Sequence, residues 1–202
     1  MENTNKGLEI IGPWTRLTSR KIYENPWIHL REDQVKRPDG SPGIYGVIEY
    51  KNLAVGVVAI DEQNRVILVG QHRYPMNYYS WELPEGGCPK GVETVAAAAE
   101  RELREETGYS ATRWDYFGPM EISNSTTDEV AHFYLARGLK AGDASPEETE
   151  ILATKLVPFD EAYRQCMNGE INESLTIVGL SRAHYFLGQE KLNGQTEPRK
   201  RK

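Results

Sequence analysis

Three glutamates stand close together in one short stretch of the chain: Glu102, Glu105 and Glu106, within the run RELREE. Because each residue of an α-helix advances by about 100°, this spacing puts the three carboxylates on one helix face. Like charges four residues apart cost on the order of a few tenths of a kcal/mol in an isolated helix. A bound divalent cation would remove that repulsion, and oxygen-rich sites suit Mg²⁺ or Mn²⁺. The alternative is an ordinary solvated helix face.

The residues around these glutamates follow a longer pattern. It reads G-x5-E-x7-R-E-U-x-E-E-x-G-U, with U a bulky apolar residue, and it is matched by Gly87, Glu93, Arg101, Glu102, Leu103, Glu105, Glu106, Gly108 and Tyr109. This segment resembles the signature box of the Nudix hydrolases. One position departs from it, because Tyr109 stands where a smaller aliphatic residue is commoner. The resemblance implies that Arg101 and Glu93 stabilise the loop before the helix rather than react.

The same resemblance implies a metal site. Its ligands would be Glu102, Glu106 and the backbone carbonyl of Gly86, with Glu105 as a further ligand or as the base that positions a water molecule. Glycine at positions 86 and 87 makes physical sense, because it lets the backbone approach the helix and a ligand closely. The expected cofactor is Mg²⁺, with Mn²⁺ as a substitute.

The segment before the box extends the resemblance. The sequences Gln71–Pro75 and Trp81–Gly87 are similar to the corresponding segment of ADP-ribose and nucleotide-sugar pyrophosphatases. The resemblance implies that Arg73 binds the diphosphate and that Glu82 supports the site. An arginine suits this task because its guanidinium bonds phosphate oxygens in pairs. A mutual ion pair of Arg73 and Glu82 at the surface is the alternative.

In that subfamily the N-terminal β arm is exchanged between two subunits, and one of its aromatic side chains stacks on the nucleobase. The candidates here are Tyr45 and Trp27, and the resemblance implies a homodimer. Aromatic residues of a β arm also serve in a core or in a dimer interface, which is the alternative for both.

Two loops bear on substrate and catalysis. The ADP-ribose branch has a proline in a Ser-Pro-Gly context past the box, whereas this chain reads ISNSTT over 122–127. This departure favours a broader nucleoside diphosphate sugar hydrolase, whose polar loop could bond a hexose, although a plain surface loop explains it equally well.

The acidic loop 146–150 matches in position a loop that, in the same group of enzymes, supplies a carboxylate from beyond the box. The resemblance selects Glu148 and Glu150 as candidate catalytic bases. A solvated connection is the alternative.

Periodicity and turn residues predict the elements that position these groups. Residues 14–50 should form an antiparallel β arm, and Leu53–Ile60 and Arg65–Gln71 a hairpin. Residues 74–90 should be mostly loop, with one short strand at Trp81–Leu83. A helix is expected over Val92–Thr107, ended by Gly108. Further strands are expected at Tyr116–Met120, Ala131–Ala136 and Ile151–Val157, and further helices at Asp160–Asn168 and Ser174–Leu192.

The order of these elements and the resemblance predict an α+β fold. It would be a Nudix-like α/β/α sandwich with a mixed sheet, plus the N-terminal antiparallel β arm. The expected divisions are a β arm over residues 1–50, a Nudix hydrolase domain over 51–192 and a disordered basic tail over 193–202.

Composition narrows the class of protein. The chain has 202 residues, 39% hydrophobic and 27% charged, which supports a packed core. A net charge of −6 argues against nucleic acid as a partner. The longest apolar run, Leu53–Ile60, is too short to span a membrane, and the sequence begins without the features of a secretory signal. Two cysteines without metal-ligand spacing favour a reducing, cytoplasmic location.

Together these features predict an Mg²⁺-dependent hydrolase that splits the diphosphate of nucleoside diphosphate sugars into nucleoside monophosphate and sugar 1-phosphate. An ADP-ribose-specific pyrophosphatase and a triphosphatase of the MutT kind are alternatives within the enzymes. The alternative from another class is a sensor that binds a nucleotide sugar without cleaving it.

Overall fold

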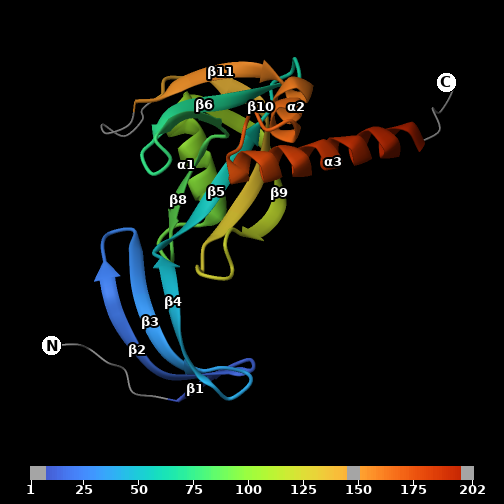
Figure 1. Ribbon diagram of the computed structural model, residues 1–202. Helices are drawn as coiled ribbons and strands as arrows, with labels where there is room; N and C mark the ends of the chain where they lie inside the picture. The colour runs from blue at the N-terminus through green and yellow to red at the C-terminus, as the bar shows by residue number, and fades with distance from the viewer. Residues whose placement is uncertain (1–7, 145–150, 197–202) are drawn as a thin grey trace. The chain divides into compact units, whose positions relative to one another are not determined.

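The computed structural model describes residues 8–144 and 151–196. The chain divides into two compact units, which are described one at a time. The N-terminal unit comprises the residues up to Leu53 together with Pro89–Val92 and Met120–Val130. The core unit comprises Ala54–Cys88, Glu93–Pro119 and the chain from Ala131 onward. Figure 1 shows the elements of both units.

The N-terminal unit is built on one antiparallel sheet, as the sequence predicts. Asn25 closes the turn before the third strand, because its Oδ1 accepts hydrogen bonds from the amides of Trp27 (2.9 Å) and Ile28 (2.8 Å). Asp39 closes the next turn by accepting from Ser41. The strands are adjacent in chain order: β1 (Glu9–Ile11), β2 (Trp14–Glu24), β3 (Ile28–Lys36) and β4 (Pro42–Tyr50).

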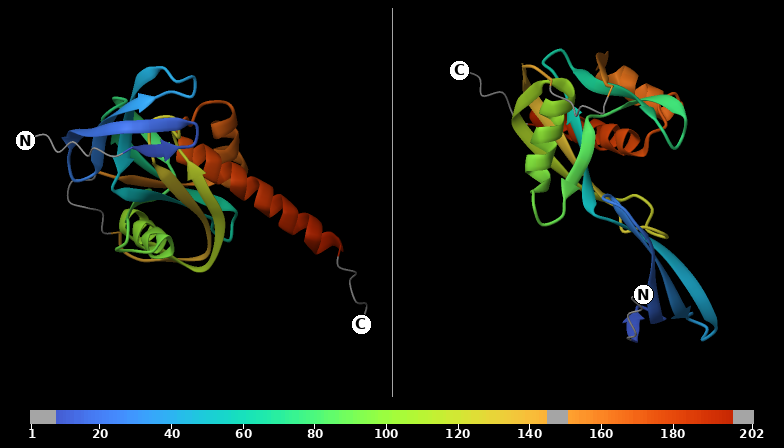
Figure 2. Two further views of the ribbon diagram at one scale, coloured as in Figure 1. Left: turned by 90° about the horizontal axis from the view of Figure 1, so that it is seen from below. Right: turned by 90° about the vertical axis from the view of Figure 1, so that its left-hand side faces the viewer.

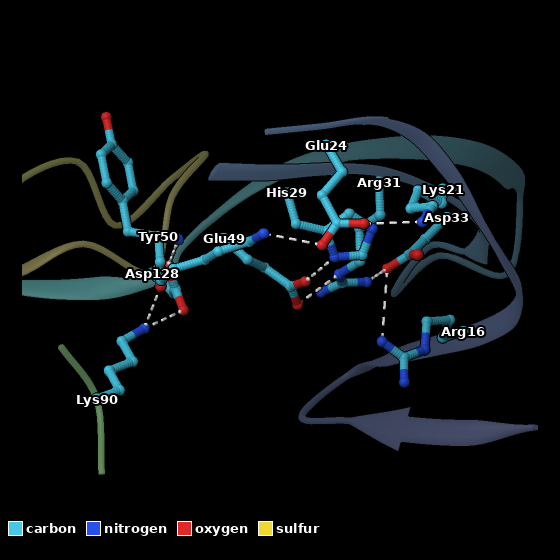
Figure 3. A network of polar contacts seen from close by, with 11 residues as sticks. Arg16, Lys21, Glu24, His29, Arg31, Asp33, Glu49, Tyr50, Lys90 and Asp128 are labelled. Atoms are coloured by element: carbon cyan, nitrogen blue, oxygen red, sulfur yellow. Dashed lines mark hydrogen bonds and ion pairs between the residues drawn. The ribbon is translucent and has the colours of Figure 1, made fainter. Parts of the chain in front are cut away.

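Charged side chains form a network in this unit (Figure 3). Arg31 donates to Glu49 at 2.9 Å and pairs with Asp33, while Arg16 lies 3.7 Å from the same Asp33 carboxylate. His29 Nδ1 lies 2.9 Å from Glu49. Asp33 is only 3% exposed, so the two guanidinium groups compensate a charge that would be costly to bury alone. These contacts link the three long strands of the sheet.

The core unit contains two sheets. The first has the strand order β8-β5-β10-β9 and the second the order β11-β6-β7. Strands β5 and β10 pair in parallel, whereas β6 pairs antiparallel with both β11 and β7. The strands are β5 (Asn52–Ala59), β6 (Arg65–Arg73), β7 (Tyr78–Glu82), β8 (Glu85–Pro89), β9 (Tyr109–Glu121), β10 (Val130–Ala141) and β11 (Ala153–Pro158).

The predicted hairpin of Leu53–Ile60 and Arg65–Gln71 is wrong, although both strands exist. They lie in different sheets, and between them only an isolated bridge joins Ile60 to Val66. Both strands are deeply buried, so their runs of apolar residues carry no alternation that would specify a partner. Strand β5 pairs instead with the distant β10, and β6 pairs with the distant β11 and with β7, the next strand along the chain.

The prediction that 74–90 is mostly loop is also wrong in part, because β7 and β8 occupy much of it. Prolines and glycines argue against a central strand. Strand β8 lies at the edge of its sheet, where a proline such as Pro89 is tolerated although it lacks an N–H, and its glycines at 86 and 87 keep their backbone donors.

Three helices complete the core unit: α1 (Val95–Thr107), α2 (Phe159–Met167) and α3 (Ser174–Thr196). Helix α1 begins after Thr94, whose hydroxyl accepts from Ala97 N, and ends at Gly108 with φ of 75°. Figure 2 shows α1 on one side of the strands of this unit and α2 and α3 on the other. This confirms the predicted α/β/α layers. The predicted basic tail, 193–202, falls partly in α3 and partly outside the described residues.

The hydrophobic core lies between the strands and the last two helices. Val58, Leu68 and Leu135 of the sheets are fully buried and share one cluster with Leu180 and Ala183 of α3. Ala98, Ala99 and Leu103 are the fully buried apolar residues of α1. None of the described helices is both long and apolar enough to span a bilayer.

Candidate active site

The loop before α1 lies directly against the acidic face of that helix. A Cβ atom at Gly86 would overlap the carboxylate of Glu102, so a larger residue would displace that carboxylate from its present position. On the neighbouring turn, Glu106 is 5% exposed and its Oε2 accepts a hydrogen bond of 3.0 Å from the amide of Glu85. The structure therefore brings Gly86 next to Glu102, and Glu106 next to the residue before Gly86.

Arg101 ties the loop to the helix. Its guanidinium donates to the carbonyl of Gly87 at 2.7 Å and to both oxygens of Glu93 at 3.2 and 3.0 Å. It also donates to Glu102 at 2.8 Å and to Glu105 at 3.0 Å. The hydrogen bond with Glu93 raises the pKa of Arg101 above its ordinary value, so the group stays charged. Arg101 thereby offsets the repulsion among the acidic side chains, as well as holding the loop.

The donor atoms here suit a hard dication. Carboxylates and a backbone carbonyl are the oxygen ligands that Mg²⁺ prefers, and the loop backbone at Gly86 lies directly against the Glu102 carboxylate. Within residues 8–144 and 151–196, no three acidic, histidine or cysteine side chains already converge as a metal cage. Glu102 and Glu105 are instead hydrogen-bonded to Arg101. The residues fit the metal chemically, and its binding would draw these carboxylates from Arg101.

Arg73 and Glu82 form the ion pair that the sequence left as an alternative, but it is buried rather than superficial. Arg73 Nε lies 3.0 Å from both oxygens of Glu82, a residue 1% exposed. Its Nη2 bonds Glu82 and Glu85. The remaining Nη1 makes no hydrogen bond to any residue that the structure describes, and the side chain is 37% exposed. Arg73 can thus hold Glu82 and still offer a donor to phosphate.

Glu85 and Glu173 belong to this cluster and were missed by the sequence reasoning. Burial raises the pKa of Glu85 well above its ordinary value, the charges of Glu173 and Glu82 add to this, and Arg73 opposes it. Glu173 sits at the start of α3, where its carboxylate accepts from the amides of Leu175 (2.8 Å) and Thr176 (2.6 Å). Glu85 could have been identified from the sequence, because it is a charged residue between Pro84 and Gly86. Nothing in the sequence indicates Glu173, which only the fold brings to this cluster.

The other predicted site residues lie outside this cluster. Tyr45 belongs to the N-terminal unit, where its hydroxyl donates to the carbonyl of Ser125 at 2.7 Å and its ring meets Trp14 edge-on at 5.5 Å. Trp27 belongs to the same unit and is 66% exposed. Glu148 and Glu150 lie outside the described residues, and their roles stay predictions.

The polar loop 122–127 forms hydrogen bonds within itself and with strand β4. The carbonyl of Ser123 accepts from the amides of Thr126 (3.0 Å) and Thr127 (2.9 Å). The amide of Ile48 on β4 donates to the carbonyl of Thr126 at 2.9 Å. These contacts give the loop a structural role within the N-terminal unit, in line with the alternative of a plain surface loop.

Known proteins resemble this chain over most of its length. It is 32% identical to an ADP-ribose pyrophosphatase of Mycobacterium tuberculosis, with 83% of this chain and 82% of that protein covered. It is 30% identical to the methanol dehydrogenase activator of Bacillus methanolicus, over 87% of this chain and 94% of that protein. A crystal structure of an ADP compounds hydrolase covers 96% of this chain and all of its own with a TM-score of 0.76; at 21% identity this shows the fold.

Two family models match successive parts of the chain. The nucleoside diphosphate sugar hydrolase N-terminal domain matches residues 14–48, which include strands β2 and β3 and most of β4. The NUDIX domain matches residues 50–176, which include the glycine loop, the box helix and Arg73. The chain therefore belongs to the Nudix family, as a Nudix pyrophosphatase that carries the N-terminal domain of nucleoside diphosphate sugar hydrolases.

Proposed function

We propose that the protein hydrolyses the diphosphate bond of nucleoside diphosphate sugars in an Mg²⁺-dependent reaction, giving nucleoside monophosphate and sugar 1-phosphate. The observation that carries the proposal is the contact of Gly86 with the Glu102 carboxylate, with Glu106 bonded to the amide of Glu85. This arrangement sets oxygen donors beside Arg73, which pairs with Glu85 of β8 from the end of β6, a strand of the other sheet. The N-terminal domain match supports the nucleotide-sugar class.

Glu102, Glu106 and the carbonyl of Gly86 are the residues that would hold the metal, with Glu105 as a further ligand. When bound, Mg²⁺ neutralises charge on the diphosphate and makes the phosphorus a better target for attack. Mn²⁺ would serve the same ligands, because they are all oxygen donors.

The remaining steps belong to side chains of the protein. Arg73 binds a phosphate oxygen through Nη1 while Glu82 fixes its orientation. Glu105, whose side chain is 29% exposed, is the described carboxylate that can accept a proton from the attacking water. Glu148 and Glu150 are the alternative bases. The water attacks one phosphorus in line, and the bridging oxygen leaves with the other phosphate.

The N-terminal unit is proposed to join two copies of the chain and to offer Tyr45 or Trp27 to the nucleobase. Both side chains retain apolar surface suitable for stacking.

An ADP-ribose-specific enzyme is the alternative function, and the similarity to the ADP-ribose pyrophosphatase of M. tuberculosis favours it. A sensor that binds nucleotide sugars without cleaving them is less well supported by the sequence, because every carboxylate of the Nudix box is present.

The test is a substrate panel with and without metal. Wild type, Glu106→Gln and Glu100→Gln would be incubated with ADP-ribose, ADP-glucose, GDP-mannose and UDP-glucose, with Mg²⁺ or with chelator, and nucleoside monophosphate would be measured. Glu100 is exposed on the same helix and serves as the matched control. We expect wild type and Glu100→Gln to cleave several sugars only with Mg²⁺, and Glu106→Gln to lose turnover by orders of magnitude. Cleavage of ADP-ribose alone would establish the specific alternative, and near-normal turnover by Glu106→Gln would refute the metal site.

A further inference from the structure

The loop before α1 contains a turn at residues 89–92 that has no part in the proposed mechanism. Arg101 holds the chain on both sides of this turn, because it bonds Gly87 before it and Glu93 after it. Those two residues belong to the core unit, whereas the turn itself belongs to the N-terminal unit. Gly86 lies only three positions before the turn. The contacts of the turn therefore bear on the backbone that presents the Gly86 carbonyl.

Lys90 fixes this turn to the end of β4 (Figure 3). Its ammonium donates to the carbonyl of Tyr50 at 2.6 Å and to Oδ2 of Asp128 at 3.0 Å. Its backbone amide donates to the carbonyl of Lys51 at 3.4 Å. The other oxygen of Asp128 accepts from the amide of Tyr50 at 2.7 Å. Lys90 and Asp128 thus bond each other and, between them, both backbone groups of Tyr50.

These contacts complete the outer edge of β4. The strand is the last in the order of its sheet, and an edge strand carries N–H and C=O groups that no further strand pairs. At Ile48 the loop backbone takes these groups: Ile48 N donates to the carbonyl of Thr126 at 2.9 Å, and Asp128 N donates to the carbonyl of Ile48 at 3.2 Å. Two residues further, at Tyr50, the side chains of Asp128 and Lys90 take them. The position of Lys90 is therefore set by backbone groups as well as by an ion pair.

The turn needs an anchor because the chain around it is rich in glycine, at positions 86, 87 and 91. Glycine loses the most conformational freedom on folding, and Gly91 adopts a φ of 77°. Within the turn, the amide of Val92 donates to the carbonyl of Pro89 at 3.2 Å. Contacts that order this segment before a metal arrives reduce the entropy that metal binding must supply. Loss of the Lys90 contacts would thus weaken metal binding without changing any ligand.

We propose that Lys90 is a positioning residue for the metal site and that Asp128 is the partner through which it acts. The inference rests on the proposed function, because it concerns the metal site of that reaction. Lys90 holds the turn, and the turn sets the backbone at Gly86. Arg101 then carries this placement to the carboxylate of Glu102, to which it donates at 2.8 Å.

The test measures metal binding directly, without substrate. The Kd of Mn²⁺ would be determined by isothermal titration calorimetry for wild type, Lys90→Met, Asp128→Asn and the double variant. Methionine removes the charge of Lys90, and asparagine keeps an oxygen that can accept from the amide of Tyr50. We expect the Kd to rise about threefold in each single variant, as for loss of one exposed ion pair. The double variant should show no further rise, because the two side chains act as a pair.

Two further variants serve as controls. Lys90→Arg keeps the charge and the donors and should keep the wild-type Kd. Lys36→Met removes an exposed lysine at the opposite end of β3 from Ile28, the partner of Tyr50, and should also leave the Kd unchanged. Amide hydrogen exchange over residues 86–93, measured without metal, should be faster in Lys90→Met but not in Lys36→Met. The kcat at saturating Mg²⁺ should stay near wild type in Lys90→Met, since no ligand has changed.

An unchanged Kd in both Lys90→Met and Asp128→Asn would overturn the inference, and so would an equal rise in Lys36→Met. If the rise in the double variant equals the product of the two single rises, Asp128 is not the partner of Lys90. Asp128→Asn keeps the acceptor for the Tyr50 amide, so it should fold even where Lys90→Met does not. A wild type that binds no Mn²⁺ would refute the metal site itself, whereas binding by wild type with unaffected variants would refute this inference alone.

Discussion

The buried hydroxyl of Thr176 accepts a hydrogen bond of 2.9 Å from the amide of Leu83, which joins the first turn of α3 to the end of β7. Leu83 directly follows Glu82, the partner of Arg73, so this contact fixes the strand end that carries the ion pair. Thr176→Val keeps the shape of the side chain but leaves the Leu83 N–H buried without a partner. We expect a loss of about 1–3 kcal/mol in the free energy of unfolding, measured with denaturant, and a lower kcat. Thr176→Ser should restore most of both, and a valine variant as stable as wild type would contradict the assignment.

Gly86→Ala tests the close approach of the loop to α1. The added methyl would overlap the Glu102 carboxylate, so either that carboxylate or the loop must leave its position, and both are proposed to hold the metal. We expect a large rise in the Mg²⁺ concentration needed for half-maximal activity, measured by metal titration. Gly188→Ala is the matched control, because a Cβ at Gly188 meets nothing within 4 Å in α3. That variant should keep its metal response and gain about 0.5–1 kcal/mol of stability. An unchanged metal response in Gly86→Ala would refute the role of the glycine.

Arg101→Lys tests whether a guanidinium is needed to hold the loop. The arginine bonds Gly87, Glu93, Glu102 and Glu105 at once, and an ammonium cannot reproduce this planar set of donors. We expect reduced thermal stability and a lower kcat, while the charge is kept. Arg104→Lys, on the exposed side of the same helix, should change neither value. If Arg101→Lys keeps wild-type kcat and melting temperature, the charge alone is sufficient.

The local part of the site could be predicted from sequence because it depends on spacing along one helix and one loop. The box pattern placed Glu102 and Glu106 on a single face, and the structure sets them beside Gly86 and Glu85. Gly108 likewise ends α1, since a left-handed residue there is a local requirement.

The parts that failed depend on distant partners. Strands β5 and β6 have the predicted residues but pair with the distant strands β10 and β11, which no turn signal reveals, and β6 also pairs with β7 across the short turn at 74–77. Glu173 joins the Arg73 cluster only because α3 begins beside the end of β7, through Thr176 and Leu83. Thr176 and Leu83 are 93 positions apart in the sequence. A contact at that separation produces no periodic pattern of residues, so it could be identified only from the structure.

Glu190 supplies a prediction for the dependence of stability on pH. It lies on α3 and pairs with Arg137 of β10 at 2.7 Å and with Arg113 of β9 at 3.0 Å, and the Arg137 hydrogen bond lowers the pKa of Glu190 below its ordinary value. A carboxylate with a lowered folded pKa stabilises the protein above its unfolded pKa, about 4.3, and this contribution is lost as pH falls through the folded value. We therefore expect Glu190→Gln to melt below wild type at pH 7, with the difference shrinking as the pH falls below about 4 and vanishing at more acid pH. The control Glu62→Gln, on the exposed turn after β5, should have the melting temperature of wild type across this pH range. If the difference in melting temperature between Glu190→Gln and wild type stays constant down to about pH 2, the ion pairs of Glu190 do not cause it.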